Sequence, residues 1–275
     1  MSSADQTFPF ITNMQHHPEA IAHRGGNGEW PGETIGAYEH ASSLGVDVIE
    51  MDIYVTSDQQ LVLMHDRSVG KTTDGTGKVH QFTLKEIQRL NAGYHWSPDG
   101  RTFPYRLPLA DLPPELQRTL SVPSLREVFD QFGDMRTIIE MKPAKHSPAA
   151  KLWELLQQYP TLIPRVLVAS FSDHYINEFR ELSKGQVATS VSIKEFIELL
   201  LGFHGFEKPF KPCLVDAPHW LLCKFLVERI RKRGYKLHAW TVNKRDDMTR
   251  MKDLGVDGII TDYPTLLLEV LGRKT

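Results

Sequence analysis

Two carboxylates two residues apart, Glu50 and Asp52, lie in a stretch that is otherwise largely apolar. Residues 46–54 are rich in β-branched side chains and follow Gly45, so they are predicted to form a strand, with residues 61–64 as its hairpin return. Side chains two apart share one face of a strand, which places both carboxylates together. Such a pair is costly near an apolar core unless one carboxylate is protonated or a cation neutralises both. The alternative is a surface pair bonded to a neighbouring loop.

Other short apolar stretches also end in residues that can bind anions or transfer protons. His23 and Arg24 follow one such stretch, His65 follows the hairpin return, and Glu140 and Lys142 lie at the end of another. An imidazole titrates near neutral pH, and arginine and lysine bind phosphate or carboxylate groups. These residues can act together only if the fold brings the ends of their stretches to one place.

Strands alternate with helices along most of the chain. The eight predicted strands are residues 19–23, 46–54, 137–141, 166–171, 187–191, 213–215, 237–242 and 258–260, and nearly all are followed by residues with helical spacing. Such alternation is typical of parallel βαβ units, and eight units in 275 residues favour a closed TIM (β/α)8 barrel. An open doubly wound sheet is the alternative, but no Gly-rich phosphate-binding sequence follows the first strand to support it.

A long irregular segment, residues 67–134, interrupts this alternation between the second and third barrel strands. It contains one predicted helix, residues 84–90, opened by Thr83 with Glu86 at capping-box spacing. Long irregular segments in compact domains are usually functional loops or lids. We therefore expect a single domain, residues 1–275, with an inserted lid. Three aromatic residues of the segment could contact substrate or could simply fold it onto the barrel: Tyr94, Trp96 and Phe103.

The C-terminal mouth of a TIM barrel gathers side chains from the ends of several strands. Glu50, Asp52 and Glu140 would place three carboxylates in one mouth, where they would repel one another strongly. An all-oxygen set suits one hard divalent cation, Mg²⁺ or Ca²⁺, and no Cys or His cluster with zinc spacing competes with it. The sequence leaves the choice between these two metals open.

Positively charged and imidazole side chains are expected beside that cation. The metal and Arg24 can each bind a non-bridging phosphate oxygen, and Lys142 adds positive charge. One of His23 and His65 could take a proton from the attacking group while the other protonates the leaving alkoxide. A lone His23 would more commonly be a packed histidine, but two histidines beside three carboxylates favour P–O cleavage in a phosphodiester. Direct attack by water and attack by a substrate hydroxyl to give a cyclic phosphate are both open.

A series of short motifs connects these residues along the chain. They are Ile-Ala-His-Arg-Gly-Gly at 21–26, Glu-Met-Asp at 50–52, His-Asp at 65–66, Val-Pro-Ser-Leu at 122–125, Ile-Glu-Met-Lys-Pro at 139–143, Ser-Phe at 170–171, Trp-Thr-Val-Asn at 240–243 and Gly-Val-Asp-Gly-Ile-Ile-Thr-Asp-Tyr-Pro at 255–264. In this order the motifs resemble those of the glycerophosphodiester phosphodiesterases, over about residues 20–271. The resemblance implies a TIM barrel with these site residues: metal ligands Glu50, Asp52 and Glu140, acid–base residues His23 and His65, and phosphate or substrate contacts Arg24, Lys142 and Trp240.

One motif departs from the pattern of that family. Where the family usually has Pro-Glu-Asn-Thr, this chain has Pro31, Gly32, Glu33 and Thr34. The family's Glu therefore falls on Gly32 and its Asn on Glu33, so their roles do not transfer directly. Glu33 could supply a supporting carboxylate from one position along the chain, or it could join the metal site.

The leading functional hypothesis is hydrolysis of a glycerophosphodiester to an alcohol and glycerol 3-phosphate. A second is lysophospholipase D activity, suggested by apolar residues after the fifth strand. Those at helical spacing are predicted to pack in the core, whereas those in the Gly-broken loop that follows could receive an acyl chain or dip into a membrane surface. The first group is Ile193, Phe196, Ile197, Leu200 and Leu201, and the second is Phe203, Phe206 and Phe210. A third hypothesis, a catalytically inactive phosphate-binding barrel, is disfavoured because both histidines and all three carboxylates are present.

Composition limits the partners and the compartment. Lys plus Arg number 32 and Asp plus Glu 34, with no basic block, which disfavours nucleic acid or an anionic membrane as the main partner. No apolar stretch reaches the roughly 18 residues that span a bilayer. Cys213 and Cys223 are too few for a disulfide scaffold and are expected to be reduced packing residues. We therefore expect a cytoplasmic enzyme acting on a small-molecule glycerophosphodiester or lysophospholipid.

Overall fold

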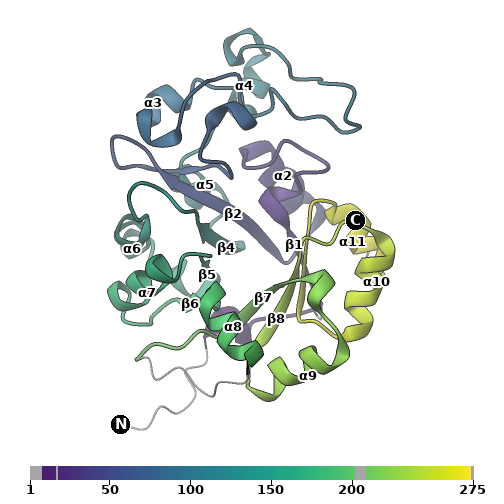
Figure 1. Cartoon of the computed structure of the whole chain (residues 1–275). Coiled ribbons are helices and arrows are strands. Elements are labelled where there is room, and N and C mark those ends of the chain that lie inside the picture. The colour runs from purple at the N-terminus through teal and green to yellow at the C-terminus, as the bar shows by residue number, and fades with distance from the viewer. Residues whose placement is uncertain (1–7, 17, 202–208, 274–275) are drawn as a thin grey trace.

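The chain forms a barrel of parallel strands surrounded by helices (Figure 1). The computed structural model describes residues 8–16, 18–201 and 209–273. Eight strands lie in the spatial order β6-β5-β4-β2-β1-β9-β8-β7, and a parallel bridge between Ser190 and Leu214 joins the two ends. Their bounds are β1 Glu19–Ala22, β2 Val48–Val55, β4 Arg136–Met141, β5 Val166–Ala169, β6 Ala188–Thr189, β7 Leu214–Pro218, β8 Lys236–Trp240 and β9 Gly258–Thr261. The predicted TIM barrel is confirmed.

The two faces of β2 separate apolar from ionisable side chains. Ile49, Met51 and Ile53 pack in the main core between the strands and the surrounding helices. Val48 belongs to a smaller apolar cluster inside the barrel, and Glu50 follows it on the same face because side chains alternate along a strand. The predicted hairpin is confirmed, since β3 (Leu61–Leu63) pairs antiparallel with the outer end of β2.

Helices cover the outside of the barrel. Their apolar faces fill the main core, and side-chain caps at Thr34 and Ser124 satisfy backbone N–H groups at two of the N-termini. At the opposite end of the barrel from the mouth, Phe8 and Phe10, from the start of the short helix α1 (Pro9–Thr12), join the interior apolar cluster. The surrounding helices are α2 Ile35–Leu44, α5 Leu125–Phe132, α6 Ala149–Gln158, α7 Asp173–Leu182, α8 Ile193–Leu201, α9 Lys224–Lys232, α10 Arg245–Leu254 and α11 Pro264–Leu271.

The inserted segment is more helical than the sequence suggested. Thr83 and Glu86 form the expected capping box, but their helix α3 ends early (Leu84–Ile87), and a second helix, α4 (Pro114–Leu120), follows it. The prediction of a single helix is wrong because prolines at the start of α4 resemble loop residues, although proline is well tolerated in a first helical turn. Helix α5 lies within predicted residues 67–134 but packs in the main core, so it belongs to the barrel. Three single-turn 3₁₀ segments complete the insertion: Val69–Lys71, Val79–Gln81 and Leu109–Asp111.

Helix α8 turns an unexpected face to the barrel. Phe196 packs against the core as predicted, but Ile193, Ile197 and Leu201 are 50%, 48% and 70% exposed, so the prediction that the whole apolar stripe packs in the core is wrong. The buried face instead carries Glu195, whose carboxylate pairs with the buried Arg180 guanidinium at 2.6 Å. A buried ion pair needs all its charged atoms bonded, and the two bonds of Glu195 to Arg180 place this face of α8 inward.

Two predictions near β7 also fail. The helix expected from Trp220 begins only at Lys224, because residues His219–Leu221 form a 3₁₀ turn that leaves the Trp220 ring 71% exposed. Cys223 precedes α9 and is exposed rather than packed, while Cys213 is partly buried, and both are free thiols.

Candidate active site

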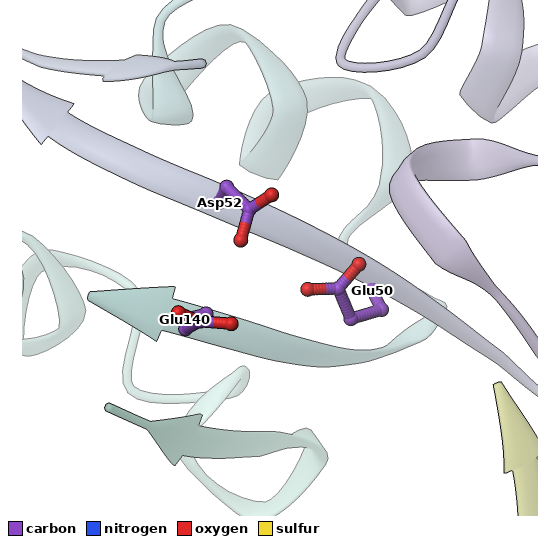
Figure 2. Close-up of side chains that lie close together, drawn as sticks. All are labelled: Glu50, Asp52 and Glu140. Carbon is purple, nitrogen blue, oxygen red and sulfur yellow. The ribbon is translucent and has the colours of Figure 1, made fainter. Parts of the chain in front are cut away.

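Three carboxylates converge inside the mouth of the barrel. Strands β2 and β4 pair in a register that sets Asp52 beside Glu140, and Glu50 shares the inward face of β2 (Figure 2). One oxygen from each carboxylate lies within 4.8 Å of the others. Glu50 and Asp52 are buried, so their charges cannot be screened by solvent. The geometry joins the three residues that the sequence predicted as metal ligands.

The charges of this carboxylate group are mutually unfavourable without a cation. Burial, and then the Asp52 carboxylate, raise the pKa of Glu50 well above its usual range and that of Glu140 to about 7. Burial opposes ionisation of Asp52 too, but Lys142 and Arg24 outweigh it and lower the Asp52 pKa. The Lys142 ammonium lies 2.9 Å from Asp52 Oδ1 and 2.8 Å from Glu140 Oε1, between two carboxylates where a cation fits.

A sharp turn after β1 brings Arg24 to the carboxylates. Arg24 has a left-handed backbone with φ of 53°, and Gly25 follows with φ of 80°. A Cβ on Gly25 would lie 2.7 Å from the Ala37 Cβ, so the turn requires glycine there. The Arg24 backbone N–H donates to Glu50 Oε2 at 3.0 Å, and its Nε lies 3.2 Å from Asp52 Oδ2. The His-Arg-Gly-Gly motif thus encodes the turn as well as the charge.

His23 is held by residues from the last strands of the barrel. Its Nδ1 lies 2.6 Å from Asp262 Oδ1, and Asn243 Nδ2 donates to the other Asp262 oxygen at 2.6 Å. Burial would raise the pKa of Asp262, but hydrogen bonds from His23 and Asn243 lower it below its usual value. An ionised Asp262 fixes the ring, and His23 Nε2 then lies 3.9 Å from Glu50 Oε2 at the site.

His65 approaches the same cavity from the end of the hairpin. Its Nδ1 lies 3.4 Å from Asp66 Oδ2, and its side chain is 32% exposed. Burial, and then the positive charge of Arg24, lower the His65 pKa below its usual value. A neutral His65 can accept a proton near neutral pH.

Glu33 supports the site from behind the carboxylates. Its Oε1 accepts the backbone N–H of Asp52 at 2.9 Å, and its Oε2 accepts the Tyr38 hydroxyl at 2.6 Å. Burial and the Asp52 charge raise the Glu33 pKa well above its usual range. Its φ of 60° is left-handed, a conformation that asparagine, the usual residue of the family at this position, adopts more readily. One Glu33 oxygen therefore holds the Asp52 backbone, while the Tyr38 hydroxyl holds the other.

A cavity of about 390 Å³ opens beside these residues. Trp240 lines it, with its ring centroid 5.7 Å from that of Phe171. No residue between 67 and 134 is among those lining it, and Trp96 of the insertion instead donates to the Asn27 carbonyl at 2.8 Å. Figure 1 shows α3 and α4 on the side of the molecule away from α8 and α9. The contacts of Trp96 thus indicate that this residue holds the inserted segment on the barrel rather than contacting substrate.

Comparison with known proteins identifies the family. The model of the "Glycerophosphoryl diester phosphodiesterase family" matches residues 23–266. The chain belongs to this family. A glycerophosphodiester phosphodiesterase from Caldanaerobacter subterraneus is 31% identical over 262 residues, which cover 92% of this chain and 97% of that protein. A lysophospholipase D from Rattus norvegicus is 28% identical over 292 residues, covering 93% of this chain and 86% of its relative.

Solved structures show the same fold, among them that of a "Putative glycerophosphoryl diester phosphodiesterase" from Silicibacter pomeroyi, with a TM-score of 0.75 at 22% identity over 98% of this chain and 99% of that one. A phosphodiesterase from Oleispira antarctica, crystallised with the product sn-glycerol 3-phosphate, superposes with a TM-score of 0.69. The match covers 94% of this chain and 98% of that one at 23% sequence identity. The barrel is thus the fold of the glycerophosphoryl diester phosphodiesterase family.

Sequence reasoning gave no role to several polar residues of this family member. Asp262 and Asn243 lie in two of the sequence motifs, but only the closure of the barrel brings Asp262 to His23 and Asn243 to Asp262. Asp216, inside β7, was missed altogether although its side chain lines the cavity. The sequence could have indicated Asp216, because it is an acidic residue within an apolar strand, as Glu50 and Asp52 are.

Proposed function

We propose that the chain is a metal-dependent phosphodiesterase that hydrolyses glycerophosphodiesters to an alcohol and glycerol 3-phosphate. The observation that carries this proposal is the convergence, at one cavity, of a three-carboxylate group, two imidazoles and two cationic side chains. Membership of the family supports the same reaction. An inactive phosphate-binding barrel would have no need to hold both histidines beside the carboxylates.

Glu50, Asp52 and Glu140 would hold the metal. The donor set fits a hard divalent cation because it is all oxygen, and because the group already draws the positive charges of Lys142 and Arg24 to within 3.2 Å of its oxygens. A bound Mg²⁺ or Ca²⁺ would polarise a phosphoryl oxygen and compensate the carboxylate charges. Glu33 would keep Asp52 in place through its backbone N–H.

The remaining residues bind the phosphate and move protons. Arg24 and Lys142 lie beside the carboxylates and can bind non-bridging oxygens of the phosphodiester. In hydrolysis one P–O bond forms to the attacking oxygen and the bond to the alcohol breaks. His23 and His65 take the proton from the attacking group and give one to the leaving alkoxide. Water and a neighbouring glycerol hydroxyl are both suitable nucleophiles, the second giving a cyclic phosphate that water then opens.

A substrate panel with product identification by phosphorus NMR tests this function. With Mg²⁺ or Ca²⁺ present, glycerophosphocholine is expected to yield glycerol 3-phosphate and choline. The cyclic phosphate, if it forms, has its own resonance. Detection of glycerol and phosphocholine would show cleavage of the other P–O bond, and absence of any product with either metal would contradict the proposal.

The apolar wall of the cavity favours lysophospholipase D activity as a second candidate. Ile193 and Leu221 line the cavity and are 50% and 37% exposed, so the wall continues onto the surface. Trp220 and Phe225, which are 71% and 70% exposed, follow the same strand end. An acyl chain of a lysophospholipid whose phosphate is at the metal site could lie along this surface. Phe203 and Phe206, predicted for this role, lie outside the described residues, and Phe210 packs against Gly185.

We expect the double substitution Ile193→Ser and Leu221→Ser to lower kcat/KM for lysophosphatidylcholine by about tenfold or more, because each buried CH₂ contributes roughly 0.8 kcal/mol. Activity on glycerophosphocholine, which has no chain, should change little. Leu107→Ser with Leu182→Ser is a matched control, since these side chains are 50% and 39% exposed and neither is among those lining the cavity. Equal losses on both substrates would reject the lipid candidate.

Lysophospholipase D activity, the second candidate, would also involve contact with a membrane surface. Lys194 and Lys224 adjoin the exposed Ile193 and Phe225, an arrangement that suits an anionic lipid surface. Within the described ranges, no helix is long and apolar enough to cross a membrane. The cytoplasmic location remains a prediction from the sequence.

A further inference from the structure

An acidic and an imidazole side chain lie side by side inside the barrel, away from the carboxylate group. Strands β7 and β8 pair in a register that places Asp216 beside His238, and Asp216 Oδ1 lies 3.4 Å from His238 Nδ1. His238 is completely buried, and Gly258 makes room for it, since a Cβ there would lie 2.6 Å from the imidazole Cδ2. Neither oxygen of Asp216 and neither nitrogen of His238 has a hydrogen-bond partner within the described residues.

Asp216 lacks the cationic partner that other interior carboxylates have. Inside the barrel Glu19 pairs with Arg136, and Asp52 pairs with Lys142. Across the described ranges, no lysine or arginine forms an ion pair with Asp216. A carboxylate withdrawn from water without a cation or hydrogen-bond donors is costly. Because Asp216 lines the cavity, a ligand in the cavity can supply that cation.

Aromatic side chains form the wall next to Asp216. Trp240 pairs in register with Pro218, two residues beyond Asp216 on the same face of β7, and Phe171 packs edge-on against the Trp240 ring with an interplanar angle of 65°. Phe196 also lines the cavity. Aromatic faces attract weakly hydrated cations, quaternary ammonium groups above all, and an adjacent carboxylate adds the countercharge.

We propose that Asp216, with Trp240 and Phe171, forms a subsite for the cationic amino-alcohol part of the substrate, such as a trimethylammonium group. The inference rests on the proposed function only in that the phosphate of the same molecule occupies the metal site. One end of the cavity then binds the negative phosphate of a zwitterionic phosphodiester, and the other end binds its positive amino group. His238 lies beside Asp216 on the neighbouring strand.

The test compares glycerophosphocholine with its neutral isostere, in which a 3,3-dimethylbutyl group replaces choline. The wild-type enzyme is expected to favour the cationic substrate in kcat/KM, and Asp216→Asn should reduce that preference by about 10- to 100-fold. Asp246→Asn makes the same chemical change at an exposed position of α10 and should leave the preference intact. An unchanged preference in Asp216→Asn, or equal rates for the two diesters in the wild type, would overturn the subsite.

A binding measurement separates this inference from the proposed function. By calorimetry with Mg²⁺ present, phosphocholine should bind the wild type about tenfold or more tightly than 3,3-dimethylbutyl phosphate, and Asp216→Asn should abolish the difference. If neither diester is hydrolysed but this binding preference holds, the hydrolytic proposal fails and the subsite stands. If both diesters are hydrolysed and the ligands bind equally, hydrolysis stands and the subsite fails. An effect of Asp216→Asn on glycerophosphoglycerol that matches its effect on glycerophosphocholine would show that Asp216 binds hydroxyl groups instead, and would also overturn it.

Discussion

Exhaustive chelation is expected to reduce phosphodiester hydrolysis by about 10³-fold or more, and added Mg²⁺ or Ca²⁺ to restore it. Glu50, Asp52 and Glu140 hold oxygens within 4.8 Å of one another in a largely buried site, so two or more negative charges persist there only with a compensating cation. In the absence of metal, Lys142 provides part of that compensation. Without metal, the Lys142 ammonium therefore binds the carboxylates rather than the phosphate of a substrate. Full activity after chelation would show that the carboxylates act without a metal.

The substitution Glu140→Gln tests the same group with the fold preserved. Glutamine keeps the volume but removes one negative ligand, so the metal Kd measured by calorimetry should rise by about tenfold or more. The melting temperature without metal should change little, because the substitution removes a partly buried charge whose pKa is raised to about 7 and Lys142 keeps Asp52 as its partner. Glu154→Gln, on the exposed face of α6, is the matched control and should change neither quantity. Unchanged metal affinity in Glu140→Gln would exclude Glu140 as a ligand.

The barrel could be predicted because each of its strands and helices can be recognised from a short stretch of sequence. Each strand is a short apolar run and nearly every one precedes a helix with its own apolar spacing, so eight repeats determine the architecture. The failure at helix α8 arose because tertiary contacts outweigh the local pattern, whereas that at helix α4 was local. Helix α8 buries Glu195 with Arg180 and exposes the stripe containing Ile197, which local spacing assigned to the core. Helix α4 begins with prolines, which local reasoning read as loop.

The site was predictable to the extent that its residues lie close in sequence. Glu50 and Asp52 share a face through the alternation of side chains along β2, and the predicted barrel added Glu140 to them, which indicated a cation site. The partnership of His23 with Asp262 joins residues 239 positions apart and exists because β1 pairs with β9. The role proposed for Asp216 depends on the aromatic rings beside it and on the absence of a lysine or arginine partner among the described residues, and its neighbours along the chain show neither.

His23→Ala and His65→Ala are each expected to lower kcat by about 10²- to 10⁴-fold while changing KM little, because proton transfer is needed chiefly in the transition state. Steady-state kinetics on glycerophosphocholine with saturating metal provide the measurement. His40→Ala is a matched control, because its side chain is 31% exposed, close to the 32% of His65, and its partner is Glu29 on the outside of the site. A loss below about threefold in either variant would remove that histidine from the proton transfers.

The double variant and Asp262→Asn decide how the two histidines work together. If His23 and His65 serve one concerted step, the loss in the double variant should be smaller than the product of the single losses. Asp262→Asn keeps the side-chain shape but removes the negative charge that holds His23 Nδ1 at 2.6 Å, so it should lower kcat in the same direction as His23→Ala. It should have little further effect in the His23→Ala background, because Asp262 acts through that imidazole. A full additional loss in that background would mean that Asp262 contacts the reacting groups itself.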